Sequence, residues 1–249
     1  MLIVVSSSAP TVARATGRRS IGKRIVVVAA AVTLGCTACG SSNSAHTAGT
    51  TGASTQRPTF VARVDNPWFP LRPGTTWVYR GIKDGKRSRD VVRVLAATRV
   101  IDGVRCTAVS DRLFLNGRLG ERTIDWYAQD ADGTVWYFGE ATAELNAAGR
   151  VTSTEGSWRS GVDGAKAGVF MPANPRVGQS FRQEYFRGHA EDHFEVLRVA
   201  ARRLLTKEWT PLEPDVLDHK LYARGTGLVD ERTVKGGDER ATLLYVRGR

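Results

Sequence analysis

The amino-acid sequence predicts a mainly β fold, in which a long-stranded antiparallel meander curls into a barrel or half-barrel and includes one long Gly/Pro-rich loop. Asp-Gly, Asn-Gly and similar pairs recur at intervals of 14 to 18 residues. Such pairs favour tight hairpins because both residues tolerate a positive φ. Between the turns, apolar and polar residues alternate with a period of two, which is typical of strands. These intervals fit strands of about 10–12 residues, and a meander of long strands twists and curls.

The expected elements follow one another along the chain. Hairpin turns are expected at Asp84-Gly85, Asp102-Gly103, Asn116-Gly117, Asp132-Gly133, Ala148-Gly149 and Gly236-Gly237. Glycines and prolines break any period in the segment 156–178, which is therefore expected to be the long loop. After it, we expect a short helix at Ala200–Lys207 and strands at Phe181–Arg187, Ala190–Ala200, Leu217–Ala223, Leu228–Lys235 and Ala241–Arg247.

Alternation assigns side chains to the two faces of the sheet. In one strand, one face has Ile124, Trp126 and Ala128, and the other has Thr123, Asp125, Tyr127 and Gln129. In the next strand, one face has Val135 and Tyr137, and the other has Trp136, Phe138 and Glu140. Aromatic residues on both faces imply that both faces are covered or that one lines a cavity. Four residues are named as possible ligand contacts, with ordinary core packing as the favoured alternative: Trp126, Trp136, Phe138 and Trp158.

Residues 1–39 are typical of a bacterial export signal. Residues 1–24 are basic and contain no acid, and an apolar run follows at residues 25–34. A run of this length is too short to span a bilayer as a helix, which needs about 20 residues. A charged start, a short apolar run and then small residues are the layout of a cleaved signal peptide. Arg18-Arg19 also resembles a twin-arginine signal, so the export route stays open.

Two cysteines follow the apolar run. A cysteine directly after small residues at this place resembles the bacterial lipobox, in which the thiol receives a diacylglycerol. Cys36 follows Leu34-Gly35 and Cys39 follows Thr37-Ala38. Either could be the lipid attachment site; we prefer Cys39, and the alternative is an ordinary secretory signal with incidental cysteines. The third cysteine, Cys106, lies in an alternating stretch and is expected to be a core residue.

The chain therefore divides into a lipoprotein signal peptide at 1–39, a flexible tether at 40–57 and a single β-rich domain at 58–249. The tether is rich in Ser, Thr, Gly and Ala, and such a segment spans on the order of 20–25 Å. The expected location is the outer face of the bacterial cytoplasmic membrane or elsewhere in the cell envelope. The expected membrane contact is the N-terminal lipid.

The formal net charge of +11 invites a nucleic-acid interpretation, which the distribution of charge weakens. Residues 1–39 contribute five basic residues and no acid. In the rest of the chain, basic residues lie beside acids, as in Glu121-Arg122. This pattern predicts a mixed, solvated surface and no nucleic-acid partner.

One long block resembles the opening of an uncharacterised family of exported bacterial proteins and lipoproteins. It reads Asp65-Asn66-Pro67-Trp68-Phe69-Pro70-Leu71-Arg72-Pro73-Gly74-Thr75-Thr76-Trp77-Val78-Tyr79, in the pattern Asn-Pro-aromatic-Phe-Pro-Leu-x-Pro-Gly-Thr-x-Trp-x-Tyr. Further agreement lies at 125–130, 135–140, 155–158, 181–185, 210–214 and 222–229, so the resemblance covers residues 60–246. No activity is known for the family. The resemblance therefore implies an exported protein and no chemistry.

The sequence contains no established catalytic motif. Gly-x-Ser-x-Gly, a phosphate-binding Gly-rich loop and His-Glu-x-x-His are absent, so no catalytic residue and no cofactor is expected. Four acids lie among the aromatic residues of the meander: Asp125, Glu140, Glu184 and Asp192. Two carboxyl groups at the right separation could act as acid and base on a glycoside, but pairing with nearby arginines is the favoured interpretation.

No metal site is expected, although one short stretch has the right residue types. His189, Glu191, His193 and Glu195 alternate, and alternate residues share one face of a strand. Imidazole and carboxylate groups suit Zn²⁺ or another first-row metal. However, such residues are about 6.5–7 Å apart along a strand, so an exposed polar face is the favoured interpretation.

Three functional hypotheses follow. The first is an exported envelope lipoprotein that binds a lipid or another apolar ligand in its curled sheet. The second is a non-enzymatic structural or interaction module of the envelope. The third is an exported hydrolase that uses paired carboxyl groups.

Overall fold

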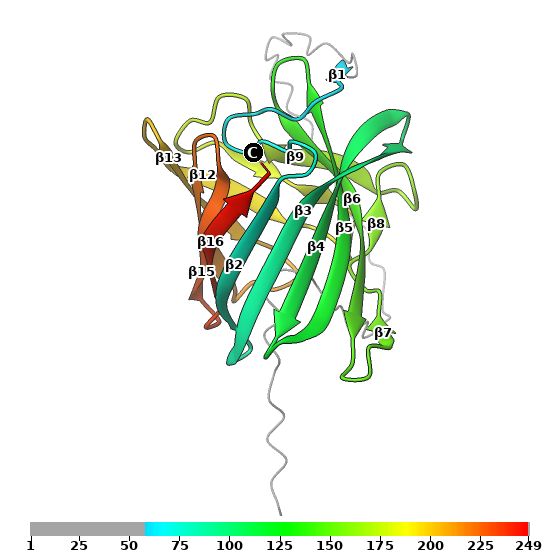
Figure 1. Cartoon of the computed structure of the whole chain (residues 1–249). Coiled ribbons are helices and arrows are strands. Elements are labelled where there is room, and N and C mark those ends of the chain that lie inside the picture. The colour runs from blue at the N-terminus through cyan, green and yellow to red at the C-terminus, as the bar shows by residue number, and fades with distance from the viewer. Residues whose placement is uncertain (1–57, 249) are drawn as a thin grey trace, which may run out of the picture.

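The computed structural model describes residues 58–248, which have an all-β architecture. Thirteen strands make one antiparallel meander that is nearly closed into a barrel, as predicted (Figure 1). Their order is β10-β12-β13-β14-β15-β16-β2-β3-β4-β5-β6-β9-β11, while β1 pairs with β5, and β7 and β8 pair with β6. The strands are β1 (Phe60–Val61), β2 (Thr76–Lys83), β3 (Lys86–Ile101), β4 (Val104–Leu115), β5 (Arg118–Asp130), β6 (Val135–Leu145), β7 (Val151–Ser153), β8 (Trp158–Arg159), β9 (Lys166–Met171), β10 (Ser180–Arg182), β11 (Glu184–Tyr185), β12 (His193–Val199), β13 (Arg203–Trp209), β14 (Leu217–Ala223), β15 (Gly227–Lys235) and β16 (Arg240–Arg247).

The three hairpins that join β2 to β5 turn where the sequence predicts. Each turn has two residues between paired strand ends, as between Leu115 and Arg118. Asn116 has a φ of 48° and Gly117 a φ of 83°, and the Asp84-Gly85 and Asp102-Gly103 turns also have two positive φ values. These are the conformations of a type I′ turn, whose twist matches that of the flanking strands.

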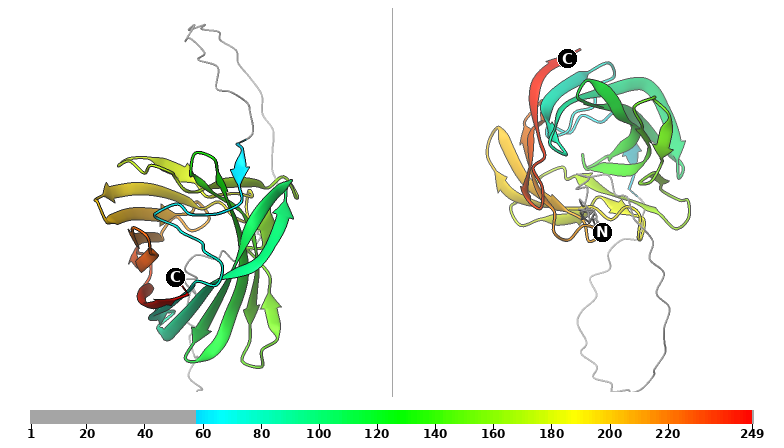
Figure 2. Two further views of the ribbon diagram at one scale, coloured as in Figure 1. Left: turned by 45° about the horizontal axis from the view of Figure 1, so that its top comes forward. Right: turned by 90° about the horizontal axis from the view of Figure 1, so that it is seen from below.

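The barrel closes along one short segment, Ser180–Tyr185. Its first half, β10, pairs with β12, and its second half, β11, pairs with β9. Between them, the amide of Gln183 donates a hydrogen bond to the carbonyl of Asp192 at 2.7 Å. Seen along its axis in the right-hand view of Figure 2, the sheet forms a ring of strands.

One local prediction holds in part and one was wrong. The segment 156–178 is mostly irregular, as predicted, but the short strand β8 lies within it, and so does β9. Gly168 permits this strand, because a side chain there would meet the backbone of Arg182 and Gln183. The segment expected as a helix at 200–207 forms much of β13, where alternate residues are buried against the interior. No helix in the part of the chain that the structure describes could cross a membrane.

Two apolar clusters cover the two faces of the meander. The larger one lies inside the barrel. The smaller one lies outside, over β4 to β6, and contains Ile101, Cys106, Ala108, Trp126, Ala128 and Phe138. Phe60 of β1 covers it, with its ring 5.4 Å from that of Phe138. Burial raises the pKa of the Cys106 thiol to about 12, so Cys106 is an unreactive core residue, as predicted.

The segment 62–75 crosses one end of the barrel and acts as a cap (Figure 2). Asn66 is buried; its side-chain amide donates hydrogen bonds to the carbonyls of Gly133 and Pro172, at 2.8 and 3.1 Å. On the other side, the amide of Gly225 donates to the carbonyl of Pro67. The cap therefore joins the β5–β6 turn to the β14–β15 turn across the barrel. Residues 65–75, which belong to the block with the family resemblance, therefore have a structural role in the cap.

Candidate functional site

The barrel contains a partly open cavity of about 280 Å³. Ligand pockets in proteins range from roughly 300 to 1,000 Å³, so this one suits a small ligand. Its lining comes from the cap, from strands β2 to β6, β9, β11 and β14 to β16, and from residues 189–192. The aromatic lining residues are Phe69, Trp77, Tyr79, Tyr127, Tyr137 and Phe170.

These aromatic rings form a packed layer next to the cap. Tyr127 and Tyr137 stack with centroids 4.8 Å apart, and Phe170 meets Tyr127 edge to face at 4.9 Å. The polar atoms of these rings form hydrogen bonds, as Tyr79 does with the carbonyl of Leu228. Trp77 donates from its ring nitrogen to the carbonyl of Thr226 at 2.7 Å. This layer gives the cavity an apolar, rigid floor.

Away from the cap, the inward-facing residues change from apolar to acidic. On β3 the order is Val94, Val92 and Asp90; on β4 it is Val109 and Asp111; on β5 it is Tyr127, Asp125 and Glu121; on β15 it is Leu228 and Glu231. In all, nine carboxyl residues line the cavity: Asp90, Asp111, Glu121, Asp125, Glu140, Glu184, Asp192, Glu231 and Glu239. Only three lysine or arginine residues line it, namely Lys83, Lys220 and Arg240. The cavity is therefore apolar next to the cap, which we call its floor, and acidic farther from the cap.

A β-bulge at Gly139 completes the acidic layer. Register shifts there, because Trp126 pairs with Gly139 while Tyr127 pairs with Tyr137. The backbone of Gly139 has a φ of 129°, and a side chain there would meet the carbonyl oxygen of Trp158. The extra residue turns Glu140 inward beside Tyr137. The sequence analysis placed these two residues on opposite faces, which was wrong because simple alternation does not account for a bulge.

Tyr137 joins two of the predicted acids. Its hydroxyl lies 2.7 Å from a carboxyl oxygen of Asp125 and 3.0 Å from one of Glu140, which face each other across β5 and β6. A hydroxyl has one proton, so it donates to only one of them at a time. Burial, with the negative charges of Asp125 and Glu140, raises the pKa of Tyr137 well above its ordinary value. The tyrosine is therefore a fixed neutral donor in an acidic layer.

On the opposite wall, lysines balance part of the acid. Lys220 forms ion pairs with Glu208 at 3.3 Å and Glu231 at 3.4 Å. Lys83 pairs with Glu239 at 3.7 Å. Both lysines lie on β14 and β2, whereas five of the lining acids lie on β3 to β6: Asp90, Asp111, Glu121, Asp125 and Glu140.

The predicted mixed surface was wrong for β3 to β5. Residues that are neighbours on a strand point to opposite faces. Glu121 faces the cavity, while Arg122 is exposed outside. Asp111 and Arg112 are arranged in the same way. Acids and bases that alternate in the sequence are thus separated into a negative interior and a positive exterior.

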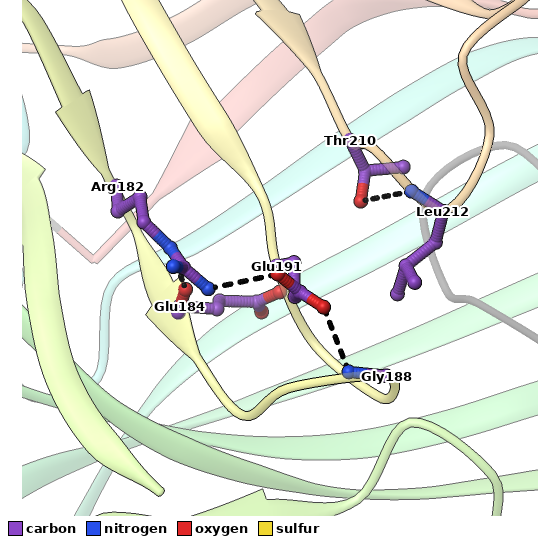
Figure 3. Close-up of polar contacts among 6 residues, drawn as sticks. All are labelled: Arg182, Glu184, Gly188, Glu191, Thr210 and Leu212. Atoms are coloured by element: carbon purple, nitrogen blue, oxygen red, sulfur yellow. Dashed lines mark hydrogen bonds and ion pairs between the residues drawn. The ribbon is translucent and has the colours of Figure 1, made fainter. Parts of the chain in front are cut away.

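The weak metal candidates do not meet at one point. Glu191 uses one carboxyl oxygen on Arg182 at 3.1 Å and the other on the amide of Gly188 at 2.7 Å (Figure 3). His189 lies in a loop with its ring 3.3 Å from Glu155. His193 begins β12 and stacks on a tryptophan; burial and Arg182 lower its pKa. The residues that the structure describes contain no group of three or more such side chains able to hold a metal.

None of the four aromatic residues named as possible ligand contacts lines the cavity. Trp126 and Phe138 belong to the outer cluster, and Trp136 packs against it. Trp158 lies in the interior cluster with its ring 5.5 Å from that of Tyr137. Trp126 and Trp158 also line a second hollow of about 330 Å³, together with Arg99 and Arg159. A ligand role for these four stays a prediction.

The structure does bring the four predicted acids together, since Asp125, Glu140, Glu184 and Asp192 all line the cavity. Sequence reasoning missed the aromatic residues beside them. The available signal was the alternation itself, which put Tyr127 on the face of Asp125 and Trp126 on the other. The lipid attachment candidates Cys36 and Cys39, the signal peptide and the tether lie outside the described residues.

No family model matches the chain, and no curated protein matches it. Solved structures with a similar fold include one from Bacteroides fragilis, named as an exported protein with a YmcC-like fold. It is 15% identical, with a TM-score of 0.41 over 73% of this chain and 99% of that chain. Another, from Parabacteroides distasonis, is named as a lipoprotein; it is 10% identical, with a TM-score of 0.38 over 77% of this chain and 100% of that chain. These two structures resemble this chain in fold alone, and membership of the family of the opening block stays a prediction.

Proposed function

We propose that this chain is an exported, lipid-anchored protein whose barrel binds a small amphiphile with an apolar body and a positively charged group. The export and the anchor rest on residues 1–39, with Cys39 or Cys36 as the lipidated residue. The ligand class rests on the cavity. This proposal narrows the expectation of a lipid or apolar ligand by adding a charge.

The observation that carries the proposal is the order of the lining along the barrel axis. Rings such as Tyr127 and Phe170 offer an apolar floor of suitable size. Beyond them, the lining has nine carboxyl residues against three lysine or arginine residues. Salt screens partly buried charges less than charges on the open surface. A ligand with a cationic head and an apolar tail would satisfy both layers, whereas an anionic head would be repelled.

Calorimetric titration with matched probes tests the charge preference. The probes are decylamine, decanol and decyl sulfate, which share one tail and are used below their micelle concentrations. The amine is expected to bind at one site, at least about tenfold more tightly than the alcohol, since one added ion contact is worth about 1.4 kcal/mol or more. The sulfate is expected not to bind.

A pair of variants separates the cavity from the general charge of the protein. Asp125→Asn removes an interior charge and should weaken amine binding about tenfold while leaving alcohol binding unchanged. Asp132→Asn removes an exposed charge in the β5–β6 turn and should change neither. Equal binding of amine and sulfate, or equal loss in both variants, would contradict the proposal.

A second candidate keeps the hydrolase hypothesis, because Asp125 and Glu140 contact one hydroxyl from neighbouring strands. Glycosidases use two carboxyl groups on either side of the scissile bond. Chromogenic glycosides test this candidate. Cleavage that is lost in Asp125→Asn and kept in Asp132→Asn would support it, and no cleavage of any probe would remove it.

A further inference from the structure

Five exposed arginines gather outside the barrel, where β2 to β5 lie side by side at the front of Figure 1. Register places Arg80 directly opposite Arg89, and Arg112 directly opposite Arg122. Arg93 lies diagonally across from Arg112 on the same face. These five residues are called the arginine face.

The arginine face lacks compensating charge on its own surface. Four of the five acids of these strands, Asp90, Asp111, Glu121 and Asp125, line the cavity instead, and the fifth, Asp130, accepts hydrogen bonds from Thr134 and Trp136. No ion pair found among residues 58–248 involves any of the five arginines. Like charges directly opposite each other on neighbouring strands destabilise a sheet. The fold thus keeps a costly arrangement that an anionic partner outside the barrel would relieve.

We propose that the arginine face docks on an anionic phospholipid surface. A guanidinium group presents a planar fork of donors that matches phosphate oxygens. Half-buried apolar side chains lie among the arginines, since Phe114 pairs with Arg89 and Val91 pairs with Arg112. Basic groups beside apolar ones suit the boundary between headgroups and acyl chains.

The part of the chain that precedes the barrel favours a membrane as the partner. Lipid on Cys36 or Cys39, followed by a tether that spans on the order of 20–25 Å, would hold the barrel beside a bilayer. There each basic residue near an anionic surface strengthens binding roughly fivefold. The choice of a lipid surface as the partner therefore rests on the proposed anchor. The existence of the arginine face does not depend on that proposal.

Vesicle sedimentation tests the docking without the anchor. The full chain is used with Cys36→Ser and Cys39→Ser in every variant, so that no attached lipid contributes. Vesicles of phosphatidylcholine with about one-third phosphatidylglycerol are compared with vesicles of phosphatidylcholine alone. Binding to the anionic vesicles should weaken as the salt concentration rises, because salt screens the charges. The face variant has Arg80, Arg89, Arg112 and Arg122 changed to Gln. The control variant has the same change at four exposed arginines elsewhere: Arg150, Arg176, Arg202 and Arg203.

The face variant is expected to lose at least about tenfold in affinity for the anionic vesicles, and the control to stay within about threefold. The melting temperature of the face variant should stay the same or rise, because like-charge contacts are removed, and its decylamine binding should be unchanged. The melting temperature shows whether the face variant is folded. Its decylamine binding shows whether the proposed cavity function is intact, so a loss of vesicle binding can be assigned to the arginine face. Equal losses in the two variants would overturn the proposal. So would a face variant that loses affinity for a double-stranded DNA fragment but not for vesicles, which would assign the face to a soluble polyanion.

Discussion

Glu121 and Arg122 are neighbours in the chain, yet the side chain of Glu121 lines the cavity and that of Arg122 is exposed on the outside of the barrel. Asp111 and Arg112 on the next strand repeat the arrangement. A chain with a formal charge of +11 thus surrounds a cavity whose lining includes nine carboxyl residues and only three lysine or arginine residues. This separation underlies both the proposed cationic ligand and the proposed anionic surface.

The tyrosines of the interior predict a loss of stability in alkali. Burial raises the pKa of Tyr79 and Tyr137 well above their ordinary value of 10.0, helped by nearby acids, and burial raises that of Tyr222 to about 12. Above pH 10 the unfolded chain loses these protons before the folded one does. The free energy of unfolding contributed by the three tyrosines is therefore complete below pH 10 and falls as pH rises above it.

Tyrosinate absorbance checks this expectation. In the folded protein at a pH of about 11, these three of the six tyrosines should stay protonated, and denaturant should then release their protons. Tyr137→Phe should make the alkaline fall in unfolding free energy shallower, and Tyr245→Phe, which changes an exposed ring, should not. Full ionisation of all six tyrosines in a protein that is still folded would contradict the described interior.

Gly139→Ala is expected to destabilise the barrel by about 2 kcal/mol or more. The new methyl group would meet the carbonyl oxygen of Trp158 at a backbone φ of 129°. Gly149→Ala is the control, because it has a positive φ of 73° but nothing within 4 Å; it should cost only about 1 kcal/mol. Urea unfolding measures both. Equal costs would mean that the bulge does not hold β8 against β6.

Two buried threonines predict opposite responses to the same change. The hydroxyl of Thr206 is buried without a hydrogen-bond partner, so Thr206→Val should be neutral or stabilising by up to about 1 kcal/mol. The hydroxyl of Thr123 is 2.8 Å from that of Thr142, so Thr123→Val should destabilise by about 1–2 kcal/mol. Midpoints of thermal unfolding compare the two. A larger loss of stability at Thr206 would show that its hydroxyl has a hydrogen-bond partner, which would contradict the described interior.

Asn66→Ala should loosen the cap and cost about 3 kcal/mol. The side chain is 1% exposed, donates to Gly133 and Pro172, and accepts from the amide of Trp68 at 2.9 Å. Asn146→Ala, at an exposed turn, is the control and should cost less than about 1 kcal/mol. Hydrogen exchange should also show faster exchange at the Trp68 amide in Asn66→Ala, and an unchanged rate would argue against the cap.

The fold was predictable where its signals are local. The Asn116-Gly117 turn and the alternation on β5 depend on residues adjacent in the chain. The bulge at Gly139 depends on contact with Trp158, and β9 depends on pairing with Glu184 and Tyr185, so no local pattern marks either feature. The site was predicted in part. Its acids were found, but charges were compared by sequence neighbour instead of by face of the strand.

The most direct measurement of the central claim is native mass spectrometry of the full-length protein isolated from its own membranes in mild detergent. We expect a diacylated N-terminal cysteine and, in the same particle, one non-covalent small molecule with a basic group and an apolar body. The bound molecule should be kept when Arg80, Arg89, Arg112 and Arg122 are changed to Gln in the chain that keeps Cys36 and Cys39, and a smaller fraction of the protein should hold it in Asp125→Asn. An anionic lipid in its place, or a protein that has the acyl mass alone and does not bind decylamine, would contradict the account.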